Sequence, residues 1–516
     1  MNNIRVSTNG GLVTENWFDL NASRYTPSST LQRMELLKTG YMGTLSLGWD
    51  NYLFLELTGR QERSSTLKDQ SFFYPSANLS FLFTQAFHMP SWWNYGKLRL
   101  SYGIVGNAPE TYTANIVYEQ GSDNGFTWNT IPSSWGNADI RPEKKYEYEI
   151  GLESKFLNNR LGIDVSYYNN RVKDQILSTP QPSTSGVKNV LMNVGEVANH
   201  GWDISISATP ILTRDFRWDL TANYGVYKNK VVKLADGVPY LEILNSGGSG
   251  IKIQAVEGQP MGDIYAQVPQ VNENGEYLVS DKGLYLNQTE LQKVGNINPA
   301  GVGGLFNSFS YKNVFLDFSI DFRIGGDVIN EMNQYATAVG LTPESLKYRD
   351  TEHGGLSYYY PGDNSSSGIP VQVDPSTGVG PNGEIIYHDG IILPGVVAST
   401  GERNTRIIPA GYYYNTTYNW GTEAEQLTYR HSVFDNSYVK LRELTIGYQF
   451  PEKMISKLGL GRLSVSVFGR NLFYFYKALK NYDAESSVGT SWANQATVGS
   501  STTATRSFGV SLRASF

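Results

Sequence analysis

Apolar and polar side chains alternate along many short segments of this chain, and this alternation limits the folds it can adopt. The last segment, 506–516, reads RSFGVSLRASF and places Phe508, Val510 and Leu512 on the face opposite Arg513. Successive side chains of a β-strand point to opposite faces, whereas a helix needs apolar residues at spacings of three and four. The segment therefore predicts a β-strand with one apolar and one polar face.

The same pattern recurs from about residue 41 to the end and predicts an all-β chain of about fourteen strands. The predicted strands lie near residues 41–50, 52–60, 77–83, 98–104, 146–153, 161–167, 202–208, 216–224, 305–311, 316–323, 437–450, 462–470 and 505–516, with a weaker one near 11–20. The 52 glycines and 35 tyrosines suit strands and turns better than helices.

Two features favour a membrane barrel over a soluble β-sandwich, in which alternation would also occur. Trp or Tyr repeatedly stands at an end of the apolar face, as at Trp49, Tyr167 and Trp202, and aromatic girdles mark the two water–lipid interfaces of a barrel. Tight turns, such as 50–51 and 312–313, also alternate with connections of tens of residues. Because barrels have short periplasmic turns and long extracellular loops, we predict a transmembrane antiparallel β-barrel.

Composition excludes several other classes of protein. No stretch approaches eighteen consecutive apolar residues, which excludes a transmembrane helix. The absence of cysteine excludes disulfides and thiolate metal sites. Net charge is −6 with no Lys/Arg-rich run, so we expect no nucleic-acid partner. Residues 1–16 lack the features of a signal peptide, although an outer-membrane protein needs an export signal.

We expect no catalytic, cofactor or metal site, and hence no enzyme. The five histidines are scattered without the spacing of metal ligands. Acidic pairs such as Glu147 with Glu149, or Asp317 with Asp321, could suggest a glycosidase. Acidic residues recur on the polar face of nearly every predicted strand, however, as they would around a water-filled lumen.

Several longer segments carry a resemblance to a known family. Residues 437–475, SYVKLRELTIGYQFPEKMISKLGLGRLSVSVFGRNLFYF, are similar to the near-C-terminal signature of the SusC/RagA family of TonB-dependent outer-membrane transporters of Bacteroidetes. Residues 41–65, 97–107, 193–211 and 303–328 resemble internal barrel segments of that family. The matches run in family order, so the resemblance implies that residues 1–516 are the C-terminal part of such a barrel, located in the cell outer membrane.

The resemblance also implies what this sequence lacks and what it would work with. Members of this family carry a signal peptide and a plug domain, and their barrels have about 22 strands. The resemblance therefore implies that the signal peptide, the plug domain and about eight early strands are missing from this sequence, as in a fragment or truncated reading frame. The family imports oligosaccharides or peptides with a SusD-like surface lipoprotein as a lid. The TonB–ExbB–ExbD system supplies energy through the plug region that this chain lacks.

Aromatic residues in the expected loops are the candidates for ligand or partner contact, because their faces can stack on sugars or on peptide side chains. These candidates are Trp128, Trp135, Tyr358, Tyr359, Tyr360, Tyr412, Tyr413, Tyr414 and Trp420. The alternative, to which we give more weight, is that they pack the loops together or touch the lipoprotein. For Phe516, the resemblance implies engagement by the barrel-assembly machinery; the alternative is a side chain that simply faces lipid.

Two other interpretations remain open from the sequence. The first is a secreted all-β protein that binds or cleaves glycans, which would need a carboxylate pair in one cleft. The second is a plugless, porin-like barrel of about fourteen strands. Such a barrel would close on itself by pairing a strand near 11–20 with residues 505–516, and the weak patterning of residues 1–40 argues against that closure.

Overall fold

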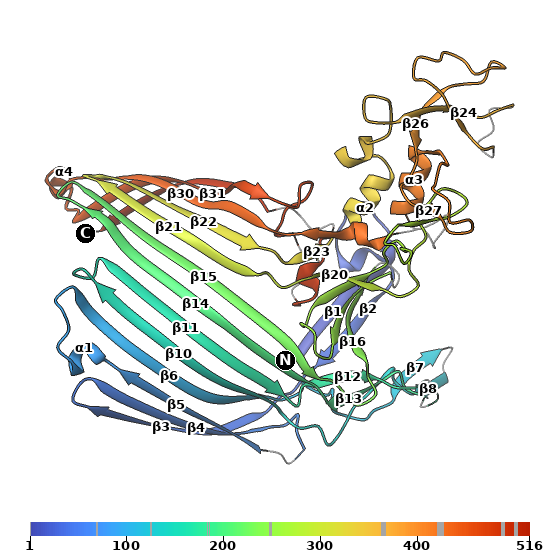
Figure 1. Ribbon diagram of the computed structural model, residues 1–516. Helices are drawn as coiled ribbons and strands as arrows, with labels where there is room; N and C mark the ends of the chain where they lie inside the picture. The colour runs from blue at the N-terminus through green and yellow to red at the C-terminus, as the bar shows by residue number, and fades with distance from the viewer. Residues whose placement is uncertain are drawn as a thin grey trace.

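The computed structural model describes residues 2–68, 71–123, 126–182, 184, 186–246, 250–362, 368–419, 428–486, 491–499 and 504–515. Thirteen of its strands form one antiparallel sheet in which each strand pairs with the next along the chain. These strands are β3 (Lys38–Trp49), β4 (Leu53–Ser64), β5 (Ser71–Phe81), β6 (Trp93–Asn107), β10 (Glu143–Phe156), β11 (Leu161–Lys173), β14 (Glu196–Leu212), β15 (Phe216–Lys233), β21 (Gly301–Tyr311), β22 (Val314–Ile324), β30 (Tyr438–Gln449), β31 (Arg462–Lys477) and β32 (Ser507–Ser515). The sheet curves into a trough (Figure 1), which confirms the predicted antiparallel barrel fold.

The weak strand expected near 11–20 is wrong. Those residues lie mostly in the connection between β1 (Asn2–Leu12) and β2 (Ser23–Arg33), just before the short helix η1 (Leu20–Ala22). Strands β1 and β2 pair with each other in a separate sheet, and β32 pairs with β31. Within the described residues, no pairing therefore joins the first part of the chain to the last strand, as the porin-like alternative required.

The short connections of the large sheet lie together at one end of the trough (Figure 1). At the turn between β3 and β4, Asp50 and Asn51 have φ angles of 48° and 57°. Positive φ at both central residues is what a two-residue type I′ hairpin requires, and Asp and Asn tolerate it better than most residues. Two small helices, α1 (Phe83–Ala86) and α4 (Glu452–Ile455), also occupy this end, and η6 (Ser456–Leu458) follows α4.

The long connections at the opposite end contain regular structure of their own. Residues 108–142 and 174–195 hold β7 (Glu119–Asp123), β8 (Phe126–Thr130), β9 (Ser134–Trp135), β12 (Ile176–Pro180) and β13 (Asn189–Asn193). Residues 234–300 hold β16 (Tyr240–Ser246), β17 (Ile251–Val256), β18 (Asp263–Ala266), β19 (Leu278–Val279) and β20 (Gln292–Asn296).

The connection 325–437 is also folded. It holds β23 (Asp327–Ile329), α2 (Glu331–Ala338), η4 (Pro343–Leu346), β24 (Leu356–Tyr359), β25 (Val371–Gln372), β26 (Tyr387–Ile391), β27 (Val396–Val397), β28 (Ile408–Pro409), α3 (Ala410–Tyr418), η5 (Tyr429–Ser432) and β29 (Val433–Asp435). In the connection 478–506, η7 spans Asn494–Ala496.

One apolar core joins three of these connections. Ile251 and Ile264 come from 234–300, Ile329 and Val433 come from 325–437, and Ala496 comes from 478–506. All five side chains are buried. These three connections thus form one packed body beside the trough, which we call the loop body. Burying apolar surface offsets the entropy lost on ordering long loops.

The two faces of the sheet differ as the alternation predicts. Tyr148, Ile150 and Leu152 of β10 expose 46%, 48% and 43% of their surface on the outer face, which suits contact with lipid. The opposite face carries charged and hydroxyl side chains. No helix in the described part of the chain is long and apolar enough to cross a membrane.

Candidate functional site

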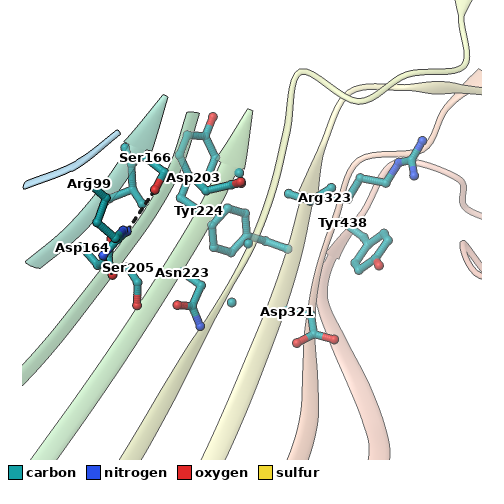
Figure 2. A pocket seen from close by; sticks show the side chains of 16 residues that line it. Arg99, Asp164, Ser166, Asp203, Ser205, Asn223, Tyr224, Asp321, Arg323 and Tyr438 are labelled. Carbon is teal, nitrogen blue, oxygen red and sulfur yellow. Dashed lines mark hydrogen bonds and ion pairs between the residues drawn. The ribbon is translucent and has the colours of Figure 1, made fainter. Parts of the chain in front are cut away.

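A cavity of about 700 Å³ lies on the polar, inner face of the sheet (Figure 2). Its wall comes from seven strands, β6, β11, β14, β15, β21, β22 and β30. Because successive side chains of a strand point to opposite faces, every second side chain of each of these strands points into the trough. The labelled polar lining consists of Arg99, Asp164, Ser166, Asp203, Ser205, Asn223, Asp321, Arg323 and Tyr438.

The charge of Arg99 is neutralised by its neighbours. Its guanidinium donates to Asp164 at 2.6 and 3.2 Å and to the hydroxyl of Ser166 at 3.2 Å. Glu153 lies 3.5 Å away on the other side. Two NH groups that meet the two oxygens of one carboxylate form a bidentate pair, which fixes the orientation of both side chains. This part of the wall is therefore rigid.

The opposite side of the cavity carries Arg323 in a different setting. Arg323 donates to the backbone carbonyls of Gly325 at 3.2 Å and Ile297 at 3.0 Å. In the described chain, neither Arg323 nor Asp203 has an ion-pair partner within 4.0 Å. A guanidinium and a carboxylate that face the same cavity can each bind a polar solute by hydrogen bonds and by charge.

A second cavity, of about 370 Å³, adjoins the first and shares Arg323 and Tyr438 with it. Glu485 and Trp492, from the connection between β31 and β32, line this second cavity. That connection therefore reaches back over the inner face of the sheet and narrows the space beside Arg323.

Glu485 fastens the connection to β30. It accepts hydrogen bonds from Arg442 at 2.6 and 2.9 Å and from Lys440 at 2.5 Å. Arg442 also donates to Asp321 at 2.5 Å. Burial acts to raise the pKa of Glu485, but the hydrogen bonds and positive charges of Arg442 and Lys440 outweigh it and lower the pKa to about 2. Glu485 therefore stays ionised and bound at neutral pH.

Two acidic side chains that line the first cavity are paired with arginines. Among the described residues, no three His, Cys, Asp or Glu side chains are grouped so as to hold a metal ion. Asp164 forms an ion pair with Arg99, and Asp321 forms one with Arg442.

The loop aromatics of the region 356–360 are mostly internal. Tyr358 and Tyr360 are 1% and 5% exposed, and their rings pack edge to face at 5.6 Å. The hydroxyl of Tyr358 donates to Asp389 at 3.1 Å, and burial raises its pKa. Tyr359, on β24, is half-buried. These positions fit the packing alternative for Tyr358, while ligand contact by the loop aromatics stays a prediction.

Tyr412, Tyr413 and Tyr414 lie on α3. Tyr414 is 3% exposed and donates to the carbonyl of Glu344 at 2.9 Å. Tyr413 packs against it at 5.1 Å, and burial raises the pKa of Tyr413. Tyr412 instead lines a cavity of about 460 Å³ within the loop body, together with Tyr360 and Arg406. The structure thus brings Tyr360 and Tyr412 together, although they lie far apart in the sequence.

The remaining candidates lie apart from these. Trp128 is exposed on β8, and Trp135, on β9, packs edge to face with Tyr118 at 6.1 Å. Trp420 and Phe516 lie outside the described residues.

Sequence reasoning missed the inner-face cavity, although its signal was present. The sequence identifies the polar strand faces, as at Asp317 and Asp321, but only as the lining of a lumen. The missing information was which strand positions share one level, because that depends on the register of seven strands.

Comparison with known proteins identifies the family. The model described as "TonB dependent receptor-like, beta-barrel" matches residues 7–270, slightly more than half of the chain. The chain belongs to this TonB-dependent receptor family. "TonB-dependent receptor P3" of Formosa agariphila is 24% identical over 494 residues, which cover 87% of this chain and 42% of that protein.

Other relatives of this TonB-dependent receptor barrel confirm the resemblance to SusC and RagA. "TonB-dependent receptor SusC" of Bacteroides thetaiotaomicron is 30% identical over 247 residues, covering 44% of this chain and 24% of that protein. The solved structure of the "RagAB peptide transporter" superposes with a TM-score of 0.62 at 18% identity, covering 90% of this chain and 47% of that one. The chain spans less than half the length of these relatives.

Proposed function

We propose that this chain forms the wall and extracellular loops of a SusC-like, TonB-dependent importer in the cell outer membrane. The observation that carries the proposal is the division of the thirteen-stranded sheet into an apolar outer face and a polar inner face with a cavity between Arg99 and Arg323. An apolar band outside and a polar lumen inside are the properties of an outer-membrane barrel. The family match to residues 7–270 supports the same conclusion.

The whole transporter would extend beyond this sequence. We infer that residues 1–516 correspond to the C-terminal part of a receptor barrel, since thirteen strands fall short of the about 22 of such transporters. The plug, on which TonB–ExbB–ExbD would act, and the early strands would come from the rest of the receptor. A SusD-like lipoprotein would cover the loop end of the barrel, and Trp128 is exposed on β8 at that end for contact with it.

The imported solute would be an oligosaccharide or a peptide. Arg323 and Asp203 face the inner cavity without ion-pair partners in the described chain, so they can pair with charged or hydroxyl groups of a solute. Tyr360 and Tyr412 in the loop cavity can stack on sugar rings or on apolar side chains. The role we assign is binding and passage of solute, without catalysis.

Fractionation of the source cells tests the proposal. An antibody against loop 326–436 is used to detect the native protein in outer-membrane and soluble fractions. We expect an outer-membrane band far heavier than 57.5 kDa, the mass of this chain. A membrane band at 57.5 kDa would favour a small self-contained barrel, and a soluble band would refute the membrane assignment. Uptake of labelled oligosaccharides and peptides by deletion and wild-type strains then separates the two solute classes.

A further inference from the structure

A row of basic side chains crosses the outer face of four neighbouring strands at the loop end of the sheet. Its members are Lys144 on β10, Arg171 and Lys173 on β11, His200 on β14, and Lys228 and Lys230 on β15. We call these six residues the basic row. All six are exposed.

The strand register places these residues side by side. Lys144 pairs with Lys173, and His200 pairs with Lys228. Arg171 and Lys230 both lie opposite Ala198, one on each side. Because neighbouring strands are about 4.8 Å apart, four strands spread the row over about 15 Å. A row of that length can contact several phosphate groups at once rather than a single small anion.

The basic row borders the aromatic girdle of the outer face. Tyr146 pairs directly with Arg171. On β14, Trp202 is the next outward position after His200, and it pairs with Tyr167. The ammonium group of Lys173 lies 5.9 Å from the centre of the Tyr146 ring. Aromatic rings of membrane proteins sit at the level of the lipid headgroups, and basic side chains beside them reach the phosphates.

The charges of the row are largely unpaired. The one ion pair that involves its members, in the part of the chain that the structure describes, joins Arg171 to Glu196 at 3.1 Å. Lys144, Lys228 and Lys230 have no carboxylate within 4.0 Å among the described residues. Like charges on adjacent strands repel, so an anion that bridges them would stabilise the arrangement.

The row is local and is not a general property of the sheet. At the same end, the outward positions of β21 and β22 are Gly301, Gly303, Phe322 and Ile324, which pair across these two strands. Further from the loop end, the same face carries apolar positions such as Ile150 and Ile204, which pair with Tyr167 and Val165. A protein partner would have to bind at the level of the membrane, whereas a lipid headgroup already lies there.

We propose that the basic row binds the phosphate groups of a phosphorylated glycolipid in the outer leaflet. The inference rests on the proposed outer-membrane location, which places the loop end of the sheet in that leaflet. The lipid would hold β10, β11, β14 and β15 at a defined depth and would bridge the repelling lysines.

The test uses the complete transporter, purified from outer membranes and stripped of lipid in detergent. Fractionation first tests its outer-membrane location. A failure of the proposed function is therefore distinguished from a failure of the basic row to bind lipid. Lipid A and its dephosphorylated form are then added, and bound lipid is counted by native mass spectrometry. The test variant is K228Q/K230Q. The matched control is K453Q/K457Q, which removes two exposed lysines at the opposite, short-turn end.

We expect wild type and the control to bind lipid A and to bind the dephosphorylated form much less. K228Q/K230Q should bind lipid A about 30-fold more weakly, since each basic residue near an anionic surface contributes about fivefold and two residues are removed. A second variant, K144Q/K173Q, tests the other strands if the first fails to fold. Equal binding by variant and control, or equal binding of both lipids, would overturn the proposal. Loss of a co-purifying protein without loss of lipid would assign the row to a protein partner instead.

Discussion

Glu485 should control how firmly the connection between β31 and β32 is held on the inner face of the sheet. The substitution Glu485→Gln keeps the size of the side chain but removes the charge that pairs with Arg442 and Lys440. The Lys440 side chain is 2% exposed, so in the described structure its buried ammonium group would keep the Tyr474 ring, 4.7 Å away, and the uncharged amide oxygen of the glutamine, but no counter-charge. An uncompensated buried charge is costly.

Two estimates of the magnitude agree. A carboxyl whose pKa falls from 4.5 to about 2 contributes about 3 kcal/mol at neutral pH. Removing one partner of a buried ion pair costs about 3–5 kcal/mol. Because Glu485 and Arg442 are each 29% exposed, we reduce these figures to about 2 kcal/mol. This corresponds to about 30-fold more frequent local opening.

Hydrogen exchange of peptides covering 478–486, in the complete transporter at pH 7, measures this opening. We expect about 30-fold faster exchange in E485Q. The control is Glu443→Gln, which breaks a 3.2 Å pair with Arg470 whose side chains are 41% and 59% exposed. Such exposed pairs contribute under about 1 kcal/mol. In wild type the contribution of Glu485 should also disappear as the pH falls from about 4.5 towards 2. Unchanged exchange in E485Q would refute the reasoning.

Three further predictions concern the loops and the cavity. Tyr358→Ala should destabilise the loop body by about 3 kcal/mol, because it empties a fully buried site; limited proteolysis should cut the 325–437 connection faster than in Tyr359→Ala and leave the sheet intact. Burial lowers the pKa of His431 to about 4, so loop stability should fall by up to about 1.4 kcal/mol per pH unit from pH 6.5 to 4; proteolysis across this range should show that His431→Gln removes the dependence. Arg323→Gln should lower uptake of an anionic solute about tenfold and leave uptake of a neutral one unchanged, and equal loss of both would contradict a charge-specific role.

The sequence alone predicts the membrane-facing half of this architecture. A strand such as 506–515 can be identified from Phe508, Val510 and Leu512 because alternation is a local property of the extended backbone. The turn at Asp50 and Asn51 is predictable for the same reason, since it needs only two residues that tolerate positive φ. Where the alternation is weak, as near 11–20, the prediction fails.

Only the tertiary structure determines the cavity and the anchoring of the loops. Arg99 and Arg323 share one cavity because the registers of seven strands bring them to one level. Glu485 binds Lys440 and Arg442 because a long connection folds back over the sheet. The same holds for the burial of Tyr358 within the loops. These arrangements depend on contacts between residues that are distant in the sequence. The entropic cost of closing a loop grows only slowly with its length, so the length of a loop does not determine where it packs.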